Sequence, residues 1–196
     1  MKEGLSAIIC IIDRSGSMEL IKTDAIGGFN AFLEEQKKLP GEAVLTTIQF
    51  NHEYEVIFEN KPLQEVEPIT EREYQPAGMT ALLDAVGKTI DAAGKRLAAM
   101  PGENRPENVI VAILTDGHEN ASKTYSLSDV KERITHQKEN YAWEFIFLGA
   151  NQDAFDEAAK IGIDQKDSFQ FDATKEGIKE AYFNLSSSVK KYRKRE

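Results

Sequence analysis

The chain has 196 residues, of which 41% are hydrophobic and 29% are charged. This composition is ordinary for a globular protein with a sizeable core. Its formal net charge of -9 and its pI of about 5.0 argue against binding to nucleic acid, which needs a basic surface. The single cysteine, Cys10, excludes an internal disulfide, and its apolar neighbours favour a buried thiol. We see no secretion signal and no apolar run near the ~20 residues of a membrane span, so we expect a cytoplasmic protein without membrane contact.

Short apolar strands alternate with longer amphipathic stretches in the first half of the chain. Residues 7–12 are rich in Ile and predict a strand that is buried on both faces. A helix of about residues 18–38 follows, because its apolar side chains recur at helical spacing. Residues 44–50 and 54–58 are two strand-like runs with only three residues between them. So short a connection predicts an antiparallel hairpin.

The second half repeats the alternation of helix and strand. A helix is predicted to start near Thr80, a buried strand covers residues 108–114, and Ser126 with Asp129 opens a further helix as a capping box. Strands at 143–148 and 168–171 and helices at 153–160 and from 174 onward complete the pattern. This order predicts a Rossmann-like α/β three-layer sandwich, with a mostly parallel six-stranded sheet, one antiparallel edge strand, and helices on both faces. We expect residues 1–196 to form one domain.

Polar side chains follow directly after two of the buried strands and precede one helix. Asp13, Ser15 and Ser17 follow the first strand, Asp116 follows the strand at 108–114, and Thr80 stands before a helix. Ligands of such sheets bind where loops leave the carboxyl ends of the strands, so we expect these side chains to meet. The set contains only oxygen donors, which suit a hard cation such as Mg²⁺, or else Mn²⁺ or Ca²⁺. The absence of His and Cys argues against zinc.

The motif IDRSGSM at residues 12–18, together with Thr80 and the TDG of residues 115–117, resembles a known site. It is similar to the metal-ion-dependent adhesion site of von Willebrand factor type A domains. Three separate segments match in order, and the predicted elements fit that fold over nearly the whole chain. Without a second domain, the sequence looks more like the small intracellular bacterial or phage-borne members of the family than like cell-surface adhesion proteins.

The resemblance implies a role for each residue of the site. Ser15 and Ser17 would bind the ion through their hydroxyls, and Thr80 would bind it directly or through water. Asp13 and Asp116 would mostly orient the waters around the ion. One coordination position would stay open for an acidic side chain supplied by a protein partner.

Further residues flank these segments and are candidates for contact with that partner: Met18, Met79 and His118. For Met79, an exposed contact and a place in the core both fit the sequence. His118 and Glu119 also fit a solvated loop. Each ion-binding residue has a simpler structural role as well, in a helix cap or a turn. Only the combination of the three segments favours a metal site.

A non-catalytic, metal-dependent protein-binding module is the function we expect. The first alternative is a Mg²⁺-dependent hydrolase or phosphotransferase, which also uses acid-rich strand ends. Against it, Ser15 stands where such enzymes have a second carboxylate, and none of the three loops contains a lysine to hold phosphate. The second alternative is an accessory subunit of an ATP-driven complex, of the chelatase or stress-response type.

Overall fold

A single six-stranded sheet forms the centre of the computed structural model, which describes residues 1–150 and 153–194. Its strands are β1 (Lys2–Asp13), β2 (Glu42–Phe50), β3 (Tyr54–Pro62), β4 (Pro106–Thr115), β5 (Glu144–Gly149) and β6 (Ser168–Gln170). They lie in the order β3-β2-β1-β4-β5-β6. All neighbouring pairs are parallel except β2 with β3, which is antiparallel at the edge. The predicted fold class and the antiparallel edge strand are confirmed.

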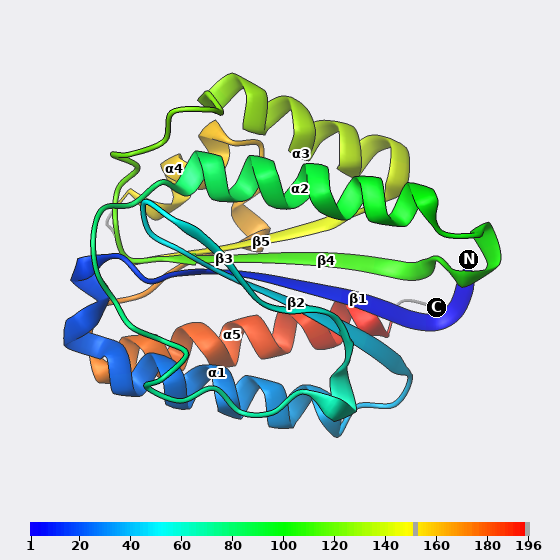
Figure 1. The fold of residues 1–196 in the computed structure, drawn as a ribbon, viewed down its shortest axis with the longest axis horizontal. Helices are drawn as coiled ribbons and strands as arrows, with labels where there is room; N and C mark the ends of the chain where they lie inside the picture. Colours follow the sequence, from blue (N-terminus) through cyan, green and yellow to red (C-terminus); the bar gives the residue numbers. More distant parts are fainter. Residues whose placement is uncertain (151–152, 195–196) are drawn as a thin grey trace.

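Helices cover both faces of this sheet (Figure 1). They are α1 (Lys22–Lys37), α2 (Leu82–Ala99), α3 (Leu127–Tyr141), α4 (Ala154–Lys160) and α5 (Lys175–Arg193). The α1 and α5 helices pack on one face, and α2, α3 and α4 pack on the other. The prediction that the first helix starts near residue 18 was wrong, because a 3-10 turn at Gly16–Ile21 precedes α1. In the described part of the chain, no helix is both long and apolar enough to cross a membrane.

The β1 strand is buried on both faces, as its run of isoleucines predicts. Ile8 and Ile12 pack toward α1 and α5, whereas Ile9 and Ile11 pack toward α2 and α3. Cys10 shares the first of these cores, and burial raises the pKa of its thiol to about 12. The thiol therefore stays protonated at neutral pH and acts as a core side chain rather than a nucleophile.

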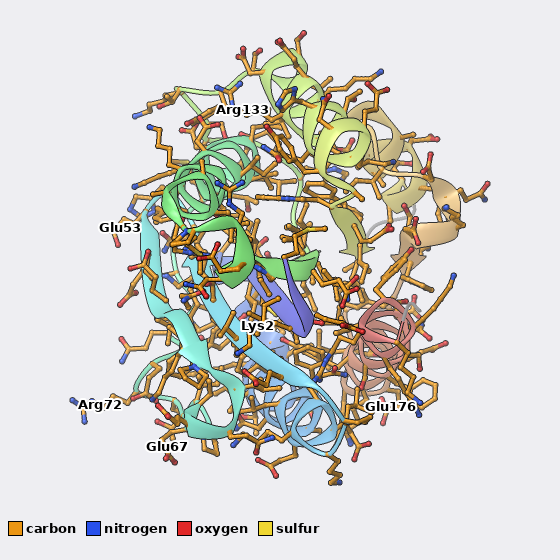
Figure 2. All side chains as sticks on the ribbon, turned by 90° about the vertical axis from the view of Figure 1, so that its right-hand side faces the viewer. Lys2, Glu53, Glu67, Arg72, Arg133 and Glu176 are labelled. Atoms are coloured by element: carbon orange, nitrogen blue, oxygen red, sulfur yellow. The ribbon has the colours of Figure 1, made fainter. Side chains whose placement is uncertain are left out.

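Charged side chains lie on the outside of the molecule, whereas the sheet and its apolar cores lie inside. Figure 2 shows the sheet between its two helical layers, with Glu67, Arg72 and Glu176 pointing away from the molecule.

The edges of the sheet are both unsuited to pairing with another strand. β6 has only three residues, and the pairing of β3 with β2 shifts register on both sides of Thr47. Short or irregular edge strands of this kind oppose aggregation.

The α5 helix is held against α1 by an apolar stripe and by polar contacts near its end. Arg193 donates a hydrogen bond to the backbone oxygen of Gln36 in α1 at 2.8 Å, whereas the Tyr192 hydroxyl donates one to Asp167, just before β6. Gly28 lets the two helices approach, because a Cβ atom there would lie 2.3 Å from the ring of Tyr182. The predicted stripe is buried throughout: Ile178, Tyr182, Leu185, Val189 and Tyr192.

Two adjacent glycines of α1 provide a matched test of this close approach. A Cβ atom at Gly27 would meet no atom within 4 Å, whereas one at Gly28 would overlap the Tyr182 ring. We expect Gly28→Ala to lower the free energy of unfolding by ~1–3 kcal/mol, the usual cost of overpacking a core. Gly27→Ala should raise it by ~0.5–1 kcal/mol, because alanine is the better helix former. Urea denaturation of both variants measures these changes, and equal changes in the two variants would contradict the packing described.

Candidate functional site

The predicted site residues lie at the carboxyl ends of β1 and β4, in the middle of the sheet. The chain leaves β1 toward β2 on one side, and β4 lies on the other side of β1. Such a reversal of strand order opens a crevice between the two loops, where ligands of open α/β sheets usually bind. Ile12 lies opposite Leu114 in the β1–β4 register. The loops that begin at Asp13 and Thr115 therefore start side by side.

The Asp13 carboxylate joins these two loops. Its side chain is 0% exposed, and each of its oxygens accepts a hydrogen bond. Oδ1 accepts from the backbone N–H of Ser15 at 2.6 Å, and Oδ2 accepts from the Thr115 hydroxyl at 2.6 Å. Burial raises the pKa of Asp13, and these hydrogen bonds oppose the rise. The buried Tyr74 hydroxyl donates to the backbone oxygen of Asp13 at 2.6 Å, which fixes the end of β1.

Three hydroxyls gather beside this carboxylate. The Oγ atoms of Ser15 and Ser17 lie 3.2 Å apart, and Ser17 donates to Oδ1 of Asp116 at 2.7 Å. A Cβ atom added at Gly117 would lie 2.7 Å from Thr80 Oγ1 and 3.6 Å from Ser15 Oγ. The lack of a side chain at Gly117 thus leaves room in front of both hydroxyls. The structure brings all five predicted site residues together.

The second carboxylate of the site ionises at a higher pH than a free aspartate. The pKa of Asp116 is raised to about 6, first by burial and then by the nearby charge of Asp13, although the bond from Ser17 lowers it. Two carboxylates that share a poorly solvated site repel each other when both are charged. A cation between them would remove this repulsion.

The loop that carries Thr80 is tied to the other two loops through its backbone. The N–H of Gly16 donates to the carbonyl oxygen of Gly78 at 3.0 Å. The Asn51 side chain, at the end of β2, donates to the oxygen of Ala77 at 2.7 Å. The Thr80 N–H donates to the Asn120 side chain at 2.9 Å. These contacts place Thr80 at the site from a distant part of the sequence.

Capping of α2 does not use the Thr80 hydroxyl. The N–H of Leu83 donates to Glu119 Oε2 at 2.9 Å, and that of Asp84 donates to the Ser122 hydroxyl at 3.0 Å. Glu119 is therefore a cap for α2 rather than a solvated loop residue. Within the described residues, the Thr80 hydroxyl has no hydrogen-bond partner, so it is available to a ligand.

One of the three residues that were predicted to contact a partner is buried in the core. Met18 is 0% exposed and packs in the core below α1, so its predicted role in partner contact is wrong. The 3-10 turn directs Met18 inward and leaves Leu20 91% exposed. Met79 is 55% exposed and His118 is exposed. In this turn, Leu20 rather than Met18 is thus the apolar side chain that faces solvent.

Three residues that shape the site were not identified from the sequence: Tyr74, Asn51 and Asn120. Thr115 and Glu119 were noted there, but not the hydrogen bonds that they form with Asp13 and with the start of α2. Asn51 directly follows β2, so its position after a buried strand was a usable signal. Tyr74 comes from an irregular segment, and no local pattern connects it with Asp13.

The donor set of the site fits a hard divalent cation. It consists of three hydroxyls and two carboxylates, and no group of three His, Cys, Asp or Glu side chains able to hold a metal occurs among the described residues. Neighbouring ligands of an octahedral ion at ~2.1 Å lie about 3 Å apart. The separation of 3.2 Å between the hydroxyls of Ser15 and Ser17 is close to that value.

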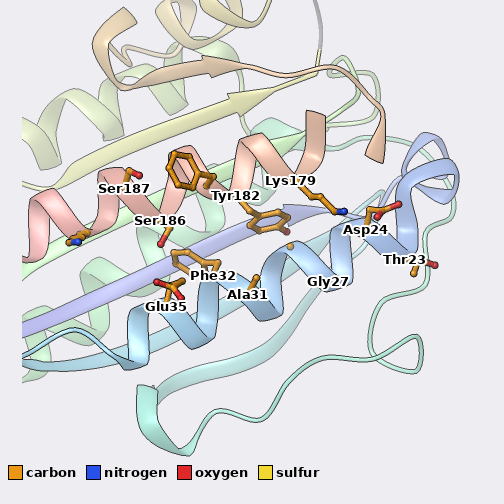
Figure 3. Close-up of a pocket in the computed structure, with 13 residues that line it drawn as sticks. Thr23, Asp24, Gly27, Ala31, Phe32, Glu35, Lys179, Tyr182, Ser186 and Ser187 are labelled. Carbon is orange, nitrogen blue, oxygen red and sulfur yellow. The ribbon is translucent and has the colours of Figure 1, made fainter. Parts of the chain in front are cut away.

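A separate hollow lies between α1 and α5, with a volume of about 660 Å³. Figure 3 shows Tyr182 and Phe32 between the two helices, where both side chains are nearly fully buried. This groove runs beside the helices and not at the carboxyl ends of the strands. It therefore does not share the oxygen-rich crevice described above.

No protein-family model matches the chain, and no curated protein matches it in sequence. Solved structures do match. The von Willebrand factor domain of the type V pili tip protein Mfa5 from Porphyromonas gingivalis has a TM-score of 0.67 at 11% identity, over 97% of each chain. A von Willebrand factor type A protein from Catenulispora acidiphila has a TM-score of 0.61 at 16% identity, over 93% of this chain.

A third similar structure is proximal thread matrix protein 1 of the mussel byssus, with a zinc-occupied metal-ion-dependent adhesion site. Its TM-score is 0.64 at 15% identity, over 94% of this chain. The chain spans 46% of that protein and 42% of the Catenulispora protein, and so corresponds to one part of each. At these identities the likeness concerns the fold alone. The chain has the fold of a von Willebrand factor type A domain.

Proposed function

We propose that this chain is a protein-binding module that contacts an acidic group of its partner through a Mg²⁺-type ion. The observation that carries the proposal is the convergence of the Ser15, Ser17 and Thr80 hydroxyls beside two carboxylates at the reversal of strand order. The mussel protein with a metal in its adhesion site supports this assignment. Residues 1–196 would act as one domain.

The residues divide into two roles. Ser15, Ser17 and Thr80 would hold the ion through their hydroxyls. Asp13 would act through its hydrogen bonds, because both of its oxygens already accept one, and Asp116 would orient water. Neutral hydroxyl ligands leave much of the ion's charge uncompensated, so the bound ion supplies a positive centre for a partner's carboxylate. That attraction is stronger where the contact excludes water.

The same geometry favours binding over catalysis. His118, which is the only histidine in the three loops, is exposed, and none of these loops holds a lysine. A general base must come within hydrogen-bond reach of the reacting group. Besides the two carboxylates, the nearby candidates are His118 and His52, whose ring lies against Gly78, and both are exposed. Metal-dependent turnover of a panel of phosphate and ester substrates, lost in Asp13→Ala, would contradict this part of the proposal.

Binding of the ion is the first test. We expect Mg²⁺ or Mn²⁺ to stabilise the protein by RT ln(1 + [L]/Kd), which is ~1.4 kcal/mol at tenfold excess over Kd. Asp13→Ala should abolish this gain, because it removes the carboxylate that joins two loops. Asp156→Ala, which removes an exposed carboxylate of α4, serves as the charge-matched control. Calorimetric titration with Mg²⁺, Mn²⁺, Ca²⁺ and Zn²⁺ measures binding, and equal binding by Asp13→Ala would refute the site.

The raised pKa of Asp116 predicts a characteristic pH dependence in the absence of metal. A carboxyl with a pKa of about 6 when folded and ~3.9 when unfolded contributes its stability fully below about pH 4. That contribution is lost as the pH rises through 6. Asp116→Asn cannot ionise, so in chelator it should gain stability relative to wild type between these pH values.

The effect of metal on the same pair should be opposite. With Mg²⁺ at pH 7.5, the wild type should gain stability and Asp116→Asn should gain less, because the amide carries no charge to balance the ion. Urea denaturation across pH, with chelator and with Mg²⁺, measures both. A wild type and variant whose difference in stability is the same at every pH and with or without metal would contradict the proposed site.

Partner binding tests the function itself. A protein captured from an extract by the immobilised chain in Mg²⁺ should be released by chelator and should not bind Ser15→Ala. Neutralising the carboxylates of the captured partner by amidation should also prevent binding. Capture that survives both chelation and Ser15→Ala would remove the ion from the contact, while leaving the fold unchanged.

A further inference from the structure

Two neighbouring hollows lie between α2 and the β2–β3 hairpin, on either side of the contact between Lys88 and the Tyr54 ring. The first, of about 410 Å³, begins beside the site at Ala81, which follows Thr80. The second, of about 340 Å³, continues along α2 as far as Arg96. Tyr54 and Lys88 line both hollows. Figure 1 shows the beginnings of β3 and α2 at the same end of the sheet. We call the two hollows together the α2–β3 groove.

Three acidic side chains line the α2–β3 groove: Glu53, Glu59 and Asp84. Asp84 is well compensated, because it accepts hydrogen bonds of 2.8–2.9 Å from the backbone N–H groups of residues 123–125. Glu53 and Glu59 are exposed and make only long contacts, of 3.4 Å with Arg14 and 3.6 Å with Arg96. Exposed carboxylates of this kind can turn away into solvent when an anionic ligand binds.

The two cations of the groove are much less well compensated. The Lys88 ammonium lies 4.1 Å from the centre of the Tyr54 ring, and within the described residues it forms no ion pair or hydrogen bond. Arg96 lies 3.6 Å from the exposed Glu59 carboxylate and 3.4 Å from the Thr46 hydroxyl, which are weak contacts. Its Nε–H is buried without a partner. A buried donor without an acceptor is costly, so an anion that enters the groove would be stabilised here.

The spacing of the positive centres fits an extended chain. Lys88 and Arg96 are separated by two turns of α2, about 12 Å at 1.5 Å per residue. The start of α2 at Leu82, beside the candidate site, lies about 9 Å before Lys88 on the same scale. An extended peptide rises about 3.3 Å per residue, so each interval corresponds to three or four peptide residues. The exposed Val56 and the ring of Tyr54 offer apolar surface between the cations.

We propose that the α2–β3 groove binds an extended acidic segment of a protein partner, with successive carboxylates at the ion, Lys88 and Arg96. The carboxylate at the ion rests on the proposed function, whereas the contacts with Lys88 and Arg96 do not. The occupant is a peptide and not a nucleic acid, because a chain with a net charge of -9 repels a dense polyanion. A peptide with a few spaced carboxylates can instead place each of them beside a positive group and away from the acidic rest of the surface.

A pair of synthetic peptides tests the spacing. One fluorescein-labelled Gly/Ser peptide carries three glutamates about four residues apart, and the other carries the same three glutamates next to one another. In Mg²⁺, fluorescence anisotropy should show roughly tenfold tighter binding of the spaced peptide. Equal affinities for the two peptides would overturn the proposed alignment along the groove.

Substitutions then separate the groove from the ion site. Lys88→Ala combined with Arg96→Gln should weaken binding of the spaced peptide roughly tenfold, while leaving the calorimetric affinity for Mg²⁺ unchanged. Lys95→Ala removes an exposed cation of the same helix that does not line the groove, and it should bind as wild type does. Single substitutions of Lys88, which is exposed, give a test that does not disturb the core. Lys88→Ala should weaken binding of the spaced peptide, and Lys88→Glu should weaken it further.

The failures of the two proposals are distinguishable. Peptide binding that is lost in Asp13→Ala but unchanged in both the Lys88 and the Arg96 variants would overturn the groove and keep the metal contact. Binding that is unchanged in chelator but lost in the Lys88 and Arg96 variants would keep the groove and overturn the metal contact. Equal competition by a single-stranded oligonucleotide of the same charge would overturn the assignment of a peptide.

Discussion

The buried carboxylate of Asp13 is the constraint on which the candidate site depends. It stands at the end of a strand whose other buried residues, apart from Ser6, are apolar, and an ionised group in that place must be hydrogen-bonded. The Ser15 amide and the Thr115 hydroxyl meet that need, and in doing so they fix the loop after β1 against the loop after β4. The hydroxyls of Ser15 and Ser17 are thereby placed next to Asp116. One buried charge thus organises the remaining oxygen atoms.

The loop that carries Thr80, the start of α2 and the loop after β4 are held together by reciprocal contacts. Glu119 and Ser122 cap the helix, and the Asp84 side chain in turn accepts backbone N–H groups of the capping loop. The Thr80 N–H and the Asn120 N–H each donate to the other residue. A site held in this way loses little conformational freedom when it binds, so more of the interaction energy appears as affinity.

The distribution of charge complements this rigid site. The chain is acidic overall, yet the positive groups of the α2–β3 groove lack strong partners, while Asp84 beside them is hydrogen-bonded within the chain. Exposed charges interact over about 10 Å at 0.1 M salt, so the acidic surface repels most anions and a local row of cations selects among them. Electrostatic patterns of this type contribute more to specificity than to affinity.

The sequence by itself determined the alternation of strand and helix, the antiparallel hairpin, and the place of Asp13, Ser15, Ser17 and Asp116 directly after buried strands. Continuous apolar runs and helical spacing report the burial of each element, and the carboxyl ends of parallel strands necessarily share one edge. Tertiary structure alone decided the inward turn of Met18, the use of Glu119 and Ser122 as caps in place of Thr80, and the contact of Tyr74 with Asp13. It also placed Lys88 and Arg96 opposite β3. Each of these depends on which distant segments become neighbours. Packing between elements decides this, and a local sequence pattern does not encode it.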